Sequence, residues 1–85
     1  MDAVTIAGLA RIVGKSRDTI ERYEKNDTFP LAPIKTAKGV RYYPISLARR
    51  LVPLVAQIPR HKKPDVELLI KINKLFKEEK EKLCQ

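Results

Sequence analysis

The side chains best suited to specific chemistry lie on one face of a predicted helix between Arg17 and Lys25. Four of them share that face at helical spacing: Asp18, Glu21, Arg22 and Lys25. Ile20 and Tyr23 share the opposite, apolar face. The DNA major groove admits one α-helix, and charged side chains on such a helix can reach the base edges. The segment therefore indicates a recognition helix, and the alternative is an ordinary helical hairpin with a solvated face.

A second helix and a tight turn would hold this face in place. Thr5 can cap a first helix. Its apolar residues recur at helical spacing: Ile6, Leu9, Ala10 and Val13. Gly14 supplies a left-handed stop before Lys15, and Ser16 offers a new cap. This order predicts a helix-turn-helix.

A short β-hairpin is predicted after a proline-bearing connector. Two short extended segments, residues 34–35 and 40–43, flank a loop that contains Gly39. Alternation places Arg41 and Tyr43 on one face of the hairpin, with Lys35 and Lys38 at the strand end and the tip. Such a hairpin would form a basic wing, able to lie against phosphates or in a minor groove. A structural hairpin with a soluble tip is the alternative.

Two further helices are predicted towards the C-terminus. The first follows Pro44 and ends before Pro59, with a kink or a division into two short helices at Pro53. Asp65 can cap the second, which extends from residue 66 to about residue 83. That helix is apolar nearly all round in its first half, and three of its residues have the spacing of a coiled-coil seam: Leu69, Ile72 and Phe76. We expect these residues to dimerise, or to face the core of the same chain.

Composition favours a polyanionic partner. The chain has 85 residues, enough for one domain with a single modest core, and 44% of them are hydrophobic. The net charge is +8, with 10 Lys/Arg against 5 Asp/Glu through Ile58 and 8 against 5 from Pro59 onward. A basic balance of this kind is typical of nucleic-acid-binding proteins, although it also serves solubility.

Several other classes of function lack support in the sequence. Cys84 is the single cysteine and His61 the single histidine, so neither an intramolecular disulfide nor a structural zinc site is expected, and no cofactor is predicted. No paired nucleophile and base or glycine-rich phosphate loop indicates an enzyme. The N-terminus lacks the pattern of a signal peptide, and no apolar run approaches the roughly 18 residues of a membrane span. We expect a cytoplasmic, nucleoid-associated protein.

Three blocks of sequence together resemble a known DNA-binding layout. They are Thr5-Ile6-Ala7-Gly8-Leu9-Ala10 followed by Gly14, then Ser16 with Thr19-Ile20-Glu21-Arg22-Tyr23-Glu24, and finally Gly39-Val40-Arg41-Tyr42-Tyr43. In this order they are similar to the DNA-binding domain of the MerR family, whose layout phage excisionases and AlpA-like proteins share. The resemblance extends from Thr5 to Leu51. The chain departs from the family at Gly8, where a carboxylate is common.

The resemblance implies a mainly α fold with a small β-hairpin wing, a winged helix-turn-helix followed by a C-terminal amphipathic helix. Residues 1–58 would form the DNA-binding domain, and residues 59–85 a basic connector and a helix that packs on it. The residues expected at the DNA are Lys15, Ser16, Arg17, Asp18, Thr19, Arg22, Tyr23, Lys35, Lys38, Arg41 and Tyr43.

Double-stranded DNA is thus the expected partner, with a homodimer or a cooperative array on DNA and no small-molecule effector or membrane. The role would be that of a small transcriptional regulator or an excisionase-like recombination accessory factor from a phage or mobile element. A protein interaction or assembly module built on the last helix, acting in packaging or segregation, is the alternative.

Overall fold

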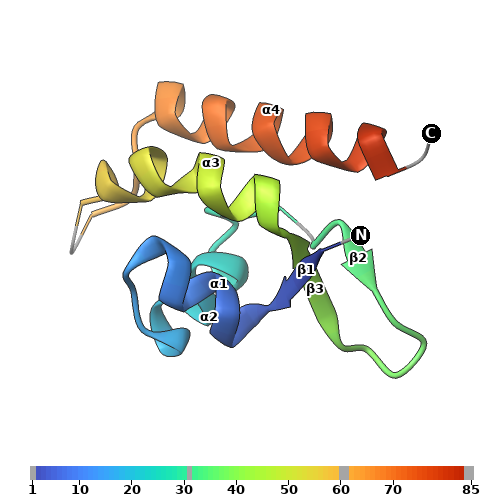
Figure 1. Ribbon diagram of the computed structural model, residues 1–85. Coiled ribbons are helices and arrows are strands. Elements are labelled where there is room, and N and C mark those ends of the chain that lie inside the picture. Colours follow the sequence, from blue (N-terminus) through green and yellow to red (C-terminus); the bar gives the residue numbers. More distant parts are fainter. Residues whose placement is uncertain (1, 31, 60–61, 84–85) are drawn as a thin grey trace.

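Two helices separated by a tight turn begin the chain, as expected, in a computed structural model that describes residues 2–30, 32–59 and 62–83 (Figure 1). Helix α1 (Ile6–Val13) starts after Thr5, whose hydroxyl accepts a hydrogen bond from the Gly8 amide. Gly14 ends it with a φ of 74°, a left-handed conformation that glycine adopts without strain. Helix α2 (Arg17–Lys25) follows at once, capped by Ser16.

A three-stranded antiparallel sheet lies beside these helices. The predicted hairpin is confirmed as β2 (Ile34–Lys35) and β3 (Arg41–Pro44). A further strand, β1 (Ala3–Thr5), pairs with the other edge of β3, which gives the order β1-β3-β2. The sequence did not predict β1, because a segment of only three residues that ends at the helix cap shows no alternation that could be recognised.

The close approach of β1 explains why Gly8 occupies its position in α1. A Cβ atom built on Gly8 would lie 2.8 Å from the Cβ of Val4, closer than two carbon atoms can pack. A side chain at this position would therefore force α1 and β1 to move apart. At this position the family to which the chain bears a resemblance commonly has a carboxylate, which would not fit here without moving the strand.

The C-terminal half consists of two long helices. Helix α3 (Ile45–Ala56) is a single element, so of the two alternatives predicted at Pro53, a kink or two short helices, the division into two helices is wrong. Pro53 lies in the last turn, where its missing amide costs one hydrogen bond and few residues follow. Helix α4 (Val66–Leu83) is confirmed with its predicted cap, since Asp65 Oδ1 accepts from the Leu68 amide at 2.8 Å.

One hydrophobic core joins the four helices with β3 and, through Val4, with β1. Helix α1 packs against both α2 and α3, and α4 packs against α3. Figure 1 shows α4 along one side of α3, α1 and α2 on the other, and the β2–β3 loop projecting on the side away from α4. The aromatic ring of Phe76 on α4 contacts Phe29 and Tyr43, with centroids 5.4 and 6.4 Å apart.

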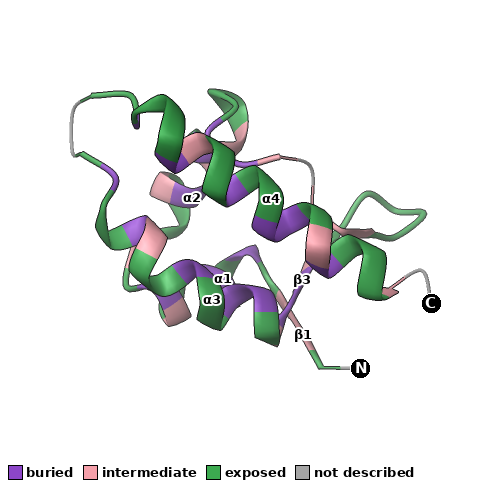
Figure 2. Ribbon diagram, turned by 90° about the horizontal axis from the view of Figure 1, so that it is seen from above, coloured by how far each residue is buried: buried purple, intermediate pink, exposed green. Residues whose placement is uncertain are grey.

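The residues predicted to dimerise belong largely to this core. Ile72 and Phe76 are 0% and 3% exposed, and Leu69 is half-buried (Figure 2). The prediction that Ile72 and Phe76 form a contact between two copies of the chain is therefore corrected. Both side chains face inward from α4, against α3 and Phe29. The large hydrophobic side chains that α4 leaves exposed are Val66 and Ile70.

A buried carboxylate fixes α4 to α3. Glu79 is 2% exposed, and its oxygens accept from Ser46 Oγ at 2.8 Å and from Arg50 Nη1 at 3.1 Å. Lys82 lies 3.4 Å away on the same helix. Burial by itself raises the pKa of Glu79, but these hydrogen bonds and the Lys82 charge outweigh it and hold the pKa below its ordinary value. The carboxylate is therefore ionised and fully partnered at neutral pH.

No helix in the described ranges has the length and apolar content needed to span a membrane. His61 and Cys84, considered above as metal or disulfide candidates, lie outside the described residues.

Candidate nucleic-acid interface

The face of α2 that points to solvent carries the polar side chains expected there. Asp18, Arg22 and Lys25 are exposed and Glu21 is half-buried, whereas Ile20 on the other face is fully buried. The amphipathic spacing of these residues therefore predicted correctly which face of α2 is exposed. The first turn is held by two contacts of Ser16, whose Oγ lies 3.2 Å from the Thr19 amide and 2.8 Å from the Thr19 hydroxyl. Both hydroxyls are therefore engaged in capping the N-terminus of α2.

The charges on this face cancel rather than accumulate. Arg17 donates from Nε to Glu21 Oε1 at 3.3 Å, one turn further along the helix. Both side chains keep solvent access, with exposed fractions of 65% and 36%. Asp18 has no ion-pair partner among the described residues. The helix as a whole has as many carboxylates as basic side chains, three of each.

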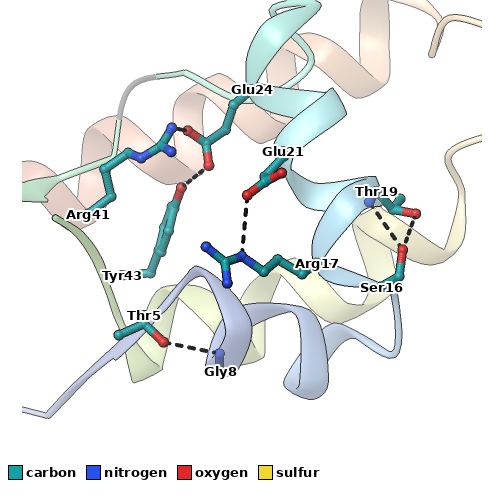
Figure 3. Close-up of polar contacts among 9 residues, drawn as sticks. All are labelled: Thr5, Gly8, Ser16, Arg17, Thr19, Glu21, Glu24, Arg41 and Tyr43. Carbon is teal, nitrogen blue, oxygen red and sulfur yellow. Dashed lines mark hydrogen bonds and ion pairs between the residues drawn. The ribbon is translucent and has the colours of Figure 1, made fainter. Parts of the chain in front are cut away.

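Glu24 ties α2 to the hairpin (Figure 3). One carboxylate oxygen accepts from Arg41 Nη1, and the other accepts from the Tyr43 hydroxyl at 2.8 Å. Both partners come from β3, so a single side chain fixes the strand against the helix. Arg41 keeps 42% of its side-chain surface exposed and can still meet an anion with the rest of its guanidinium group.

Tyr43 and Tyr23 are not available to DNA in the way predicted. Tyr43 is fully buried and Tyr23 is 7% exposed. Burial, followed by the hydrogen bond and the negative charge of Glu24, raises the pKa of Tyr43 well above its ordinary value. Burial also raises the pKa of Tyr23, against the opposing charge of Arg22. The assignment of Tyr43 to the DNA contact is wrong, because its place on β3 turns the ring into the core against Phe76.

Basic side chains gather on one flank of α2. Two adjoining hollows share Arg22, Tyr23 and Ile58, and we call them together the connector groove. Lys15 lines one hollow, while Lys62 and Lys63 line the other. The groove therefore brings the turn before α2 and the connector before α4 to the same side of the helix.

The hairpin supplies the other flank. Lys35 and Lys38 are exposed on it, as predicted, and Arg41 faces α2 through Glu24. A further hollow lies between the start of α2 and the hairpin loop, lined by Arg17, Gly39, Val40 and Arg41 among others. Arg17 and Arg41 thus border the same recess on the side of α2 away from the connector groove.

The excess of positive charge lies in the middle of the chain, which contains both flanking segments and also α3 with Arg49 and Arg50. Residues 28–64, which include the hairpin and the connector, contain eight Lys/Arg and no Asp/Glu. Residues 1–27 and residues 65–85 each contain five of either sign. An anionic partner is therefore attracted to the two sides of α2 rather than to α2 itself.

Neither a metal site nor a known relative adds to this description. Among the described residues, no group of three or more His, Cys, Asp or Glu side chains could hold a metal ion. Comparison of the chain with protein-family models, with curated proteins and with solved structures gives no match. The MerR-like resemblance therefore stays a prediction, and function must be inferred from the site.

Sequence reasoning missed two parts of the site. Glu24 was not singled out, because a carboxylate on the rim of a helix has an obvious role only once β3 is known to pass beside it. Lys62 and Lys63 belong to the predicted basic connector but were not among the residues expected at the DNA, although 37 residues without a carboxylate surround them in the sequence.

Proposed function

We propose that this protein binds double-stranded DNA, with α2 in the major groove and a basic element on either side of it. The observation that carries the proposal is the separation of charge. A neutral, polar helix face lies between a hairpin with Lys35, Lys38 and Arg41 and a connector groove with Lys15, Lys62 and Lys63.

Dimensions support this arrangement. An α-helix with its side chains is about 10–12 Å across, and the major groove is about 12 Å wide. A helix that lies in the groove has a phosphate backbone on each side. Basic groups on both flanks then meet the two backbones, while the middle of the helix meets the base edges.

Salt dependence of binding tests the proposal. If about six basic side chains neutralise phosphates, affinity for a duplex should fall by roughly 10³-fold between 50 and 200 mM salt. Fluorescence anisotropy with a labelled random-sequence duplex measures this directly. Absence of binding at 50 mM salt, or affinity that does not change with salt, would refute the proposal.

A charge-matched pair of variants separates a DNA surface from general attraction. The double variant Lys62→Gln/Lys63→Gln removes two charges beside α2, and Lys71→Gln/Lys74→Gln removes two from the exposed side of α4. The first should lower the slope of log K against log salt by about 0.9 per lysine, and the second should leave the slope almost unchanged. Equal effects would mean that net charge, not this surface, governs binding.

The cellular role that fits a small duplex binder is that of a transcriptional regulator or a recombination accessory factor of the excisionase kind. One observation favours the second candidate, a protein interaction module: Val66 and Ile70, one turn apart on α4, are 70% and 60% exposed. The charge-matched comparison distinguishes the two, because a module that uses only α4 would show the same loss of DNA attraction in both double variants.

A further inference from the structure

Two side chains on the solvent-facing side of α2, near its N-terminal end, are carboxylates: Asp18, which is exposed, and Glu21, which is half-buried. Asp18 is exposed in the first turn, and Glu21 lies one turn later beside it. If electrostatic attraction to phosphates were the only task of α2, carboxylates at these positions would oppose it. Their placement is explained if they meet donor groups in the groove, between the two backbones that the flanking lysines contact.

Only one base offers such a carboxylate a donor with no neighbouring acceptor. In the major groove guanine presents two acceptors, thymine an acceptor and a methyl group, and adenine a donor beside an acceptor. Cytosine presents its N4 amino group alone. A carboxylate is therefore attracted to cytosine, repelled by guanine and thymine, and partly repelled by adenine.

We propose that Asp18 and Glu21 determine specificity by accepting hydrogen bonds from cytosine amino groups, so that the preferred duplex has C·G pairs under the first two turns of α2. This inference rests on the proposed binding of duplex DNA. The N-terminal part of a recognition helix is the part that contacts base edges in helix-turn-helix complexes, and both residues lie there.

The ion pair between Arg17 and Glu21 strengthens the match to a C·G pair. Because Nε of Arg17 is the atom bonded to Glu21, the two terminal nitrogens of the guanidinium group stay available. They form the fork that binds guanine O6 and N7. The Glu21 carboxylate then presents an acceptor for cytosine, and the terminal nitrogens of Arg17 beside it present a pair of donors for guanine.

The test starts from the site that the wild-type protein selects from a random duplex library. Affinity is then measured for that site and for versions with each C·G pair replaced. The wild type should discriminate by about 5-fold or more at two C·G positions, the lower end of the range for a good base contact. Asp18→Ala should reduce discrimination to under about 2-fold at one of these positions, and Glu21→Ala should do the same at the other. Each variant should also bind random duplex more tightly than the wild type does, because a negative charge has been removed.

Amide variants give a change of preference that a purely structural role cannot produce. Asparagine and glutamine bind adenine through N6 and N7, so Asp18→Asn and Glu21→Gln should move the preference from C·G towards A·T at the same position. Lys63→Gln is the control: it removes one charge from the connector groove, which the proposal places on the phosphate backbone, and it should weaken binding to all duplexes alike.

The outcomes separate the two claims. A wild-type protein that does not bind duplex DNA at low salt refutes the proposed function and this inference together. A wild type that binds with salt dependence but selects no C·G pair, or variants that keep the wild-type preference, refute the inference alone. A lower melting temperature of Asp18→Ala is expected from its place at the helix N-terminus and has no bearing on base preference.

Discussion

Replacement of Glu24 by alanine tests whether one carboxylate holds the hairpin against α2. The variant removes the acceptor of the Tyr43 hydroxyl and the partner of Arg41 at the same time. Tyr43 is fully buried, so its hydroxyl cannot turn to water when the acceptor is lost. The ring is also fixed by Phe76 and cannot move aside without opening the core.

The expected loss of stability follows from the two contacts. A buried donor left without an acceptor costs about 1–3 kcal/mol. The ion pair with Arg41 is part-exposed and contributes only about 0.5 kcal/mol after screening by solvent. Glu24→Ala should therefore lower the free energy of unfolding by about 2 kcal/mol, which in a domain of this size lowers the melting temperature by about 10 °C.

A double-mutant cycle with Tyr43→Phe isolates the hydrogen bond. Urea denaturation of the two single variants and the double variant gives the coupling energy, which should be about 1–2 kcal/mol. Tyr43→Phe should be nearly neutral or stabilising when Glu24 is already alanine, because no hydroxyl is then left unpaired. Costs that add within about 0.3 kcal/mol would show that the hydrogen bond does not stabilise the fold.

Three other variants test the remaining structural claims. Folding holds the pKa of Glu79 below its ordinary value of 4.5. The ionised Glu79 carboxylate therefore contributes its full stabilisation above that pH, and this stabilisation is lost as the pH falls through the lower pKa of the folded state. Unfolding free energy should thus fall more steeply below about pH 5 in the wild type than in Glu79→Gln, and parallel profiles would contradict this. Gly8→Ala should destabilise by about 1 kcal/mol, since crowding against Val4 outweighs the gain in helix propensity. An unchanged or higher melting temperature would show that β1 can move away from the added methyl group at little cost in free energy. Phe76→Ala should lower the free energy of unfolding by about 3–5 kcal/mol at every protein concentration. A loss that changes with protein concentration, in samples whose oligomeric state is measured by sedimentation, would support Phe76 as a dimer contact instead.

The helices were predictable because the signals that define them are local. Thr5, Ser16 and Asp65 each bond to an amide three residues along the chain, so cap and helix are read from one short window. Gly14 adopts its left-handed conformation whatever surrounds it. The hairpin was found for the same reason, since Gly39 and the two short extended segments lie within ten residues of each other.

Contacts between distant segments were not predictable from the sequence. The spacing of Leu69, Ile72 and Phe76 fits a seam between two chains as well as a helix packed within one chain, and only the position of α3 decides. Alternation placed Arg41 and Tyr43 correctly on one face of the hairpin, and both reach Glu24. It gave no sign that this face is buried at Tyr43 and exposed at Arg41, because the contacts with Glu24 and Phe76 join segments that are distant in the sequence.

The separation of charge in this fold has a consequence for how affinity and preference can vary. Under the proposed function, Lys62, Lys63 and the hairpin lysines contact the phosphate backbone of any duplex, and such contacts carry no sequence information. If the proposed function holds, changes there alter affinity and salt dependence together for all duplexes. Changes at Asp18 or Glu21 alter the ratio between duplexes while the salt slope stays nearly constant. Because α2 is itself neutral, its outward residues can change without loss of the attraction that brings DNA to the surface.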